Sequence, residues 1–81
     1  MTILYTGDFM KVYKRIKDLR EDRDLTQSRL ARRLNISQRS YSYYENGERM
    51  ISPELLARLA LFYGTSVDYI LELTDNPRPY K

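Results

Sequence analysis

The sequence has no cysteine, no histidine and no tryptophan, and its 81 residues include only three glycines and three prolines. Without cysteine and histidine, the chain has no thiol nucleophile, no imidazole base and none of the nitrogen and sulfur ligands that zinc prefers. The three glycines do not form a glycine-rich phosphate-binding loop. We therefore expect no enzyme activity, no metal site and no cofactor. A carboxylate-only enzyme stays an alternative, although Asp22 and Asp24 are more simply explained as a solvated loop.

Long hydrophobic runs are absent as well. No apolar stretch approaches the length that crosses a membrane, and no basic segment precedes an apolar one at the N-terminus, as it would in a signal peptide. The lack of cysteine removes disulfides and fits a reducing compartment. We therefore expect a cytoplasmic protein without membrane contact. A length of 81 residues predicts one domain with a modest core and no separate domain for a small-molecule ligand.

The net charge of +3 conceals an uneven distribution of charge. Residues 11–39 contain ten Lys or Arg and four Asp or Glu, whereas residues 40–81 contain four and six. Positive charge is therefore concentrated in the first half of the chain, as on a surface that binds phosphates. The alternative is that cations such as Lys14 and Arg32 only solvate helix faces.

Apolar residues at helical spacing predict five helices, and a side chain that can cap a helix precedes each of them. The expected N-caps are Asp8, Thr26, Ser37, Ser52 and Ser66. Pro53 strengthens the start of the fourth helix, and Gly64 ends it. The sequence thus predicts an all-α domain over residues 9–74 and a C-terminal tail over residues 75–81.

The first helix is expected to follow Asp8 directly. Its apolar residues at helical spacing are Phe9, Val12, Tyr13, Ile16 and Leu19. Residues 1–8 would then precede the domain as a tail or an arm. Because residues 2–6 are β-prone, three interpretations stay open for them: a disordered tail, an arm that adds to a partner, or a short strand.

The segment from residue 25 to residue 47 predicts two short helices joined by a tight turn. Leu30, Ala31 and Leu34 give the first of them one narrow apolar face. Asn35 follows where the chain must reverse, and asparagine adopts the left-handed conformation more readily than most residues. Two caps, a tight turn and two short helices are typical of a helix-turn-helix that binds DNA.

The second of these helices, about residues 38–45, has two distinct faces. Tyr41 and Tyr44 lie three residues apart on the face that would pack inward. The opposite face carries hydrogen-bonding groups and no carboxylate before Glu45, so it would not repel phosphates. Its side chains are Gln38, Arg39, Ser42 and Tyr43. The alternative to DNA binding is a solvated helix in an ordinary helical bundle.

Several short motifs occur in a fixed order along the chain. They are Leu25-Thr26-Gln27, Leu30-Ala31, Leu34, Ile36-Ser37, Tyr44-Glu45-Asn46-Gly47, Pro53, Leu59-Ala60 and Gly64-Thr65-Ser66-Val67-Asp68. On these motifs, the segment from about residue 15 to residue 73 resembles the lambda-repressor-like DNA-binding domains of the Cro/CI (Xre) family. The chain departs from the family pattern at Asn35, where glycine is commoner, and at Leu56, which stands one position early. Tyr41 replaces a usual Ile or Val, so we expect rearranged packing there.

The resemblance implies a small five-helix transcriptional regulator that binds double-stranded DNA with its third helix in the major groove. We expect this regulator to be a repressor. The expected base-reading residues are Gln38, Arg39, Ser42 and Tyr43. Glutamine suits adenine, and arginine suits guanine. The expected contacts to the DNA backbone are Gln27, Ser37, Asn46 and Arg49. Arg20 and Glu45 are expected to form a structural ion pair and no DNA contact.

We expect a homodimer on DNA, because a single small module makes too few base contacts for genomic specificity. The expected dimer interface on the fifth helix consists of Val67, Tyr69, Ile70, Leu71 and Leu73. The alternative is that these apolar residues only close the core. The same fold also serves as an antitoxin or as a protein-interaction module, so a protein partner is the second hypothesis for the function.

Overall fold

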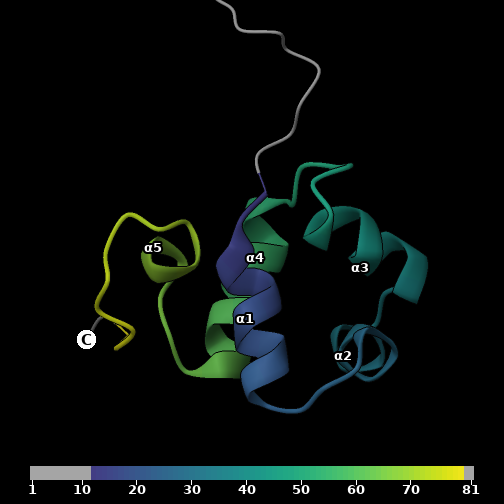
Figure 1. The fold of residues 1–81 in the computed structure, drawn as a ribbon, viewed down its shortest axis with the longest axis horizontal. Helices are drawn as coiled ribbons and strands as arrows, with labels where there is room; N and C mark the ends of the chain where they lie inside the picture. Colours follow the sequence, from purple (N-terminus) through teal and green to yellow (C-terminus); the bar gives the residue numbers. More distant parts are fainter. Residues whose placement is uncertain (1–11, 80–81) are drawn as a thin grey trace, which may run out of the picture.

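The structure is a computed structural model in which residues 12–79 are described. These residues form five α-helices and no strand (Figure 1). The helices are α1 (Lys14–Asp22), α2 (Gln27–Leu34), α3 (Gln38–Glu45), α4 (Pro53–Tyr63) and α5 (Val67–Ile70). The expected all-α fold with a central helix-turn-helix is confirmed. Among the described helices, none is both long and apolar enough to cross a membrane.

The helices pack around one buried core. α2 contacts α3, α1 contacts both α3 and α5, and α4 contacts α5. In Figure 1, α2 and α3 lie on one side of α1, and α5 lies on the other. The largest side chains with less than 2 % of their surface exposed are Ile16, Leu30, Tyr41, Leu59 and Ile70. Each of the five helices therefore contributes one of these side chains to the core.

Four helices begin at caps that the sequence predicted. The hydroxyl oxygens of Thr26, Ser37, Ser52 and Ser66 each accept a hydrogen bond of 3.0–3.1 Å from the backbone N–H three residues on. Each bond satisfies one of the N–H groups that a helix leaves unpaired at its N-terminus. Pro53 occupies the first turn of α4, where its missing N–H removes no helical hydrogen bond.

Two helices end in the left-handed conformation. Asn35 after α2 has a φ of +59°, and Gly64 after α4 has a φ of +68°. The backbone N–H of each residue returns to a carbonyl of the preceding helical turn. This geometry stops the helix and redirects the chain within one residue. Because of it, only three residues separate α2 from α3.

The first helix begins later than the sequence predicted. α1 starts at Lys14 after Tyr13, whose side chain makes no capping hydrogen bond. Val12 therefore precedes the helix, and half of its surface is exposed instead of being buried in the core. The expected cap Asp8 and the residues of the expected arm, 1–8, lie outside the described residues.

The fifth helix ends earlier than the apolar pattern suggested. α5 stops at Ile70, and Glu72 takes a left-handed φ of +64°. The backbone N–H groups of Glu72 and Leu73 then donate to the carbonyls of Tyr69 and Asp68, which closes the helix end. Leu73 consequently stands outside the helix with 71 % of its surface exposed.

Residues that follow α5 fold back onto the helices. Arg15 of α1 donates hydrogen bonds to the carbonyls of Tyr69 and Thr74 at 2.9 and 2.6 Å, and to the carboxylate of Asp75 at 2.7 Å. The hydroxyl of Thr65 donates to the carbonyl of Pro77 at 2.5 Å. The first part of the expected tail over 75–81 therefore packs against the domain.

We expect two replacements of Asn35 to differ in their effect on the free energy of unfolding. Both remove the side-chain amide, but only alanine strains the left-handed backbone. Asn35→Ala should lower the free energy of unfolding by about 1 kcal/mol, because alanine resists the left-handed conformation, whereas Asn35→Gly should cost little. Urea unfolding of both variants provides the measurement. Arg32→Ala, at an exposed helical position of α2, is the control and should change stability by less than about 0.5 kcal/mol. Equal stability of the alanine and glycine variants at residue 35 would contradict the expectation.

Candidate functional site

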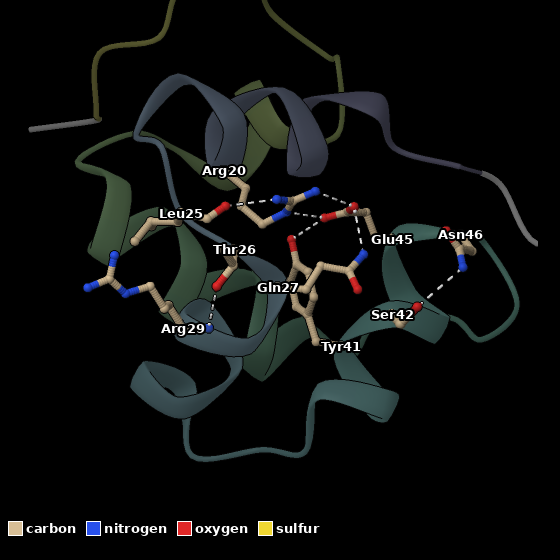
Figure 2. A network of polar contacts seen from close by, with 9 residues as sticks. All are labelled: Arg20, Leu25, Thr26, Gln27, Arg29, Tyr41, Ser42, Glu45 and Asn46. Carbon is tan, nitrogen blue, oxygen red and sulfur yellow. Dashed lines mark hydrogen bonds and ion pairs between the residues drawn. The ribbon is translucent and has the colours of Figure 1, made fainter.

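A buried carboxylate joins the helices that carry the candidate site (Figure 2). The Nε and Nη2 atoms of Arg20 in α1 donate to the two carboxylate oxygens of Glu45 at the end of α3, both at 2.9 Å. Only 12 % of the Arg20 side chain and 3 % of the Glu45 side chain are exposed. The two residues expected to pair thus lie in bidentate contact, with most water excluded.

Two further side chains complete the environment of Glu45. The hydroxyl of Tyr41 donates to its Oε2 atom at 2.6 Å, and the side-chain amide of Gln27 donates to Oε1 at 3.0 Å. Arg20 uses its third nitrogen, Nη1, to bind the carbonyl of Leu25 at 2.8 Å. The network therefore fixes α1, the loop before α2, the first residue of α2 and both turns of α3 relative to one another.

The network also sets the protonation of its members. Burial alone would raise the pKa of Glu45, but hydrogen bonds from Arg20, Tyr41 and Gln27 outweigh it and hold this pKa below its ordinary value. Burial, with the hydrogen bond to Glu45, raises the pKa of Tyr41. Glu45 is therefore ionised and Tyr41 neutral at pH 7. The packing expected to change around Tyr41 is explained by this bond, which an Ile or Val could not make.

The hydrogen bond between Tyr41 and Glu45 was not predicted from the sequence. A signal was present, because the two residues are four positions apart in one helix and such residues lie side by side on its surface. The sequence showed Tyr41 on an inward face but gave no sign that its hydroxyl would point at a buried carboxylate. The contact of Gln27 with Glu45 had no such signal in the sequence, since it joins residues 18 positions apart in different helices.

The outward side of α3 forms an open hollow of about 370 Å³. Its lining residues are Gln27, Gln38, Arg39, Ser42 and Tyr43. All four side chains expected to read bases thus line one concave surface, together with one of the four expected to contact the backbone. These side chains offer amide, guanidinium and hydroxyl groups, and no carboxylate lines the hollow.

Tyr43 lies between two arginines at the edge of this hollow. Arg39 donates a hydrogen bond from Nε to the hydroxyl oxygen of Tyr43 at 3.0 Å. The guanidinium of Arg49 stacks over the Tyr43 ring, 4.5 Å from its centroid. The two contacts hold both cations beside the aromatic ring, where cation–π attraction adds to the hydrogen bond.

The other residues expected to bind the DNA backbone already have partners. The hydroxyl of Ser37 caps α3 and donates to the hydroxyl of Ser40 at 2.9 Å. The amide of Asn46 donates to Ser42 at 3.3 Å and to Glu48 at 3.4 Å. Gln27 uses one of its two amide hydrogens on Glu45, so one remains for another acceptor.

The residues expected at a dimer interface differ in their exposure. Ile70 has no exposed surface and belongs to the core, so its expected place in the interface is corrected. Val67 and Leu71 are partly buried against the same core. The ring of Tyr69, also partly buried, is covered by the Arg15 guanidinium at 4.2 Å. Leu73 alone of the five is largely exposed.

The chain matches the model of a family described as helix-turn-helix over residues 16–70. The HTH-type transcriptional regulator YobD of Bacillus subtilis (strain 168) is 41 % identical over 66 residues, which cover 82 % of this chain and 59 % of YobD. The cryptic phage CTXphi transcriptional repressor RstR of Vibrio cholerae is 36 % identical over 53 residues, or 65 % of this chain and 48 % of RstR.

A third relative is named as an antitoxin and not as a transcriptional regulator. The antitoxin PezA of Streptococcus pneumoniae serotype 4 is 51 % identical over 43 residues, which cover 53 % of this chain and 27 % of PezA. The matched region spans between about a quarter and three fifths of the length of these three relatives. No solved structure matches the chain.

The lowered pKa of Glu45 predicts how stability should respond to acid. Glu45→Gln should lower the free energy of unfolding by about 3–5 kcal/mol at pH 7, because it breaks a buried pair. The pKa of Glu45 is lower in the folded state than in the unfolded state. Such a carboxyl stabilises the fold at pH values above its pKa in the unfolded state. This stabilisation is lost as the pH falls through its pKa in the folded state. The difference between wild type and variant should therefore narrow as the pH falls below about 4.5.

Urea unfolding of both proteins at a series of pH values measures this difference. Glu21→Gln removes an exposed carboxyl from α1 and serves as the matched control, with a small and nearly constant effect. If the difference in free energy of unfolding between wild type and Glu45→Gln stays constant or increases in acid, the ionised carboxylate does not stabilise the fold as expected.

Proposed function

Because the chain belongs to the Cro/CI-type helix-turn-helix family, we propose that it binds specific sequences of double-stranded DNA and represses transcription in the cytoplasm. The hollow on the outward face of α3 is the observation that carries the proposal. It gathers hydrogen-bonding side chains on one face of an exposed helix whose size suits the major groove. The similarity to YobD, a transcriptional regulator, and to RstR, a transcriptional repressor, supports the same function.

The first turn of α3 supplies the proposed base contacts. The amide of Gln38 suits the N6 and N7 atoms of adenine, and the guanidinium of Arg39 suits the O6 and N7 atoms of guanine. Arg39 commits only its Nε atom to Tyr43, so both terminal nitrogens stay available for a bidentate contact. Ser42 and Tyr43 lie one turn further along the hollow and complete the reading surface.

Phosphate contacts would flank this surface on both sides. The N-terminus of α2 presents unpaired backbone N–H groups beside Gln27 and favours an anion there. Beyond α3, the amide of Asn46 and the guanidinium of Arg49, both on exposed residues, would contact the next phosphates. Ser37 would contribute from the turn between the two helices. These contacts fix position and register, whereas α3 distinguishes sequences.

The buried network gives the proposed interface its rigidity. Gln27 touches both Glu45 and the hollow, so the network reaches the reading surface directly. A contact with a base edge needs its donors within a fraction of an ångström of their place. Arg20 and Glu45 themselves lie away from the DNA in this arrangement and would act by holding α3 in its orientation.

We also propose that two copies bind DNA together as a symmetric dimer. A single reading helix contacts few base pairs, and two helices in adjacent major grooves double the site. Leu73 is the exposed apolar residue on which the proposed contact centres, with the partly buried Val67 and Leu71 beside it in the sequence. The DNA site would then be an inverted repeat with half-sites about 34 Å apart.

A second candidate function is a protein-interaction module. The similarity to the antitoxin PezA, which covers 53 % of the chain, favours this function. An adaptor of this kind would keep the fold and lose the response of α3 to DNA sequence. If selection from a random pool enriches no DNA sequence, and binding to DNA stays undetectable, this second function is favoured over the first.

Variants of α3 should separate base contacts from phosphate contacts. Gln38→Ala and Arg39→Ala should each lower discrimination between a selected site and random DNA by about 1–3 kcal/mol. Arg49→Ala should instead weaken binding similarly on both and reduce the salt slope by about one unit, because it removes one phosphate contact. Fluorescence anisotropy at several salt concentrations measures both quantities.

Gln27→Ala is the uncharged control for Arg49→Ala. Its affinity should fall similarly on the selected and the random DNA, with the salt slope unchanged, because glutamine neutralises no phosphate. Equal losses on selected and random DNA for both Gln38→Ala and Arg39→Ala would overturn the assignment of α3 as the base-reading helix.

The dimer predicts two chains on each operator. Leu73→Glu should leave one chain on each DNA, since a carboxylate would be buried without a partner in the interface. Leu61→Glu places the same charge on an exposed position of α4, where 83 % of the leucine surface is accessible, and should keep two chains. Analytical ultracentrifugation with labelled DNA gives the stoichiometry. A one-to-one complex of the wild type on a non-palindromic site would contradict the dimer.

A further inference from the structure

A second hollow of about 370 Å³ lies on α2, apart from the hollow at α3. Its lining residues are Leu25, Arg29, Arg32 and Arg33, and we refer to it as the arginine groove. None of these four residues lines the hollow at α3. The groove joins three guanidinium groups to one partly buried leucine, so it combines strong positive charge with a small apolar surface.

The three arginines form no ion pair with a carboxylate among residues 12–79. No hydrogen bond or ion pair joins the side chain of Arg29, Arg32 or Arg33 to a carboxylate in this part of the chain. Arg33 instead lies over the ring of Phe62, 5.5 Å from its centroid. Like charges three and four residues apart repel one another on a helix. The groove therefore carries a local repulsion that an anion would relieve.

The helix dipole explains only part of this arrangement. Cations are favoured in the last turn of a helix, which accounts for Arg32 and Arg33 at the end of α2. Arg29 is the third residue of α2 and lies in its first turn, where the dipole disfavours a cation. The dipole therefore does not account for the third cation of the groove.

One side chain of the groove, Arg29, points away from the C-terminal end of α3. Figure 2 shows Arg29 projecting from α2 on the side away from Ser42 and Asn46 of the α3 end. Arg29 is therefore open to an anion on the side away from this end of α3.

We propose that the arginine groove binds an acidic polypeptide segment of a partner protein. Guanidinium groups match carboxylates in planar, bidentate pairs, and three of them along one helix fit successive acidic side chains. Leu25 offers contact to an apolar side chain between those carboxylates. This binding does not depend on DNA, so a partner protein would occupy the arginine groove in the absence of DNA as well.

The experiment uses a fluorescent peptide that repeats Glu-Glu-Leu, with the full chain and no DNA. Anisotropy should show binding that weakens with salt, and a peptide that repeats Gln-Gln-Leu should not bind. The double variant R29Q/R32Q should bind the acidic peptide roughly tenfold more weakly, as expected for the loss of two exposed charge pairs. Among the described residues, the guanidinium of neither Arg29 nor Arg32 lies over an aromatic ring, whereas that of Arg33 lies over Phe62. The double variant should therefore fold.

The matched control K14Q/K17Q removes the same charge from exposed positions of α1 and should leave peptide affinity within a factor of about two. An equal loss in both double variants would reduce the binding to net charge and overturn the proposal. A second arm adds a random-sequence DNA duplex, which should not displace the peptide. Displacement by DNA, together with a lower salt slope of DNA binding for R29Q/R32Q, would assign the groove to phosphates and overturn it as well.

Discussion

The orientation of the exposed helix α3 depends on one buried negative charge. The carboxylate of Glu45 accepts four hydrogen bonds, two of them from Arg20 and one each from Tyr41 and Gln27. Removing a charge from water is expensive, and such a pair often adds little net stability over an apolar replacement. The main effect of the buried pair is on geometry, because the donors satisfy the carboxylate only when α1, α2 and α3 have one relative arrangement. The position of the hollow on the outer face of α3 is fixed by that arrangement.

The parts of the fold governed by local chemistry could be predicted from the sequence. Thr26, Ser37, Ser52 and Ser66 cap their helices as expected, because a capping hydroxyl and its N–H partner are only three residues apart. Asn35 also takes the left-handed conformation expected of it. These signals lie within one turn of the chain, so no knowledge of tertiary contacts was needed.

The parts that escaped prediction depend on contacts between distant residues. Arg15 binds the chain 54 to 60 residues away, at Tyr69, Thr74 and Asp75, and no periodicity in the sequence reports such a contact. Ile70 was assigned to a surface because apolar spacing cannot distinguish a core from an interface. Five of the eight side chains expected to contact DNA line the hollow of α3, yet their partners within the chain, such as Tyr43 for Arg39, appeared only in three dimensions.

The shared ring of Tyr43 has a consequence for how the specificity of this helix can diverge. Arg39 and Arg49 both rest on this one side chain, through its hydroxyl and its face. A substitution at residue 43 therefore releases two cations at once, and a substitution at residue 39 leaves the tyrosine hydroxyl without its donor. The three side chains therefore form one unit, so a transplant of α3 alone, without residue 49, would leave the Tyr43 ring without the guanidinium that stacks on it.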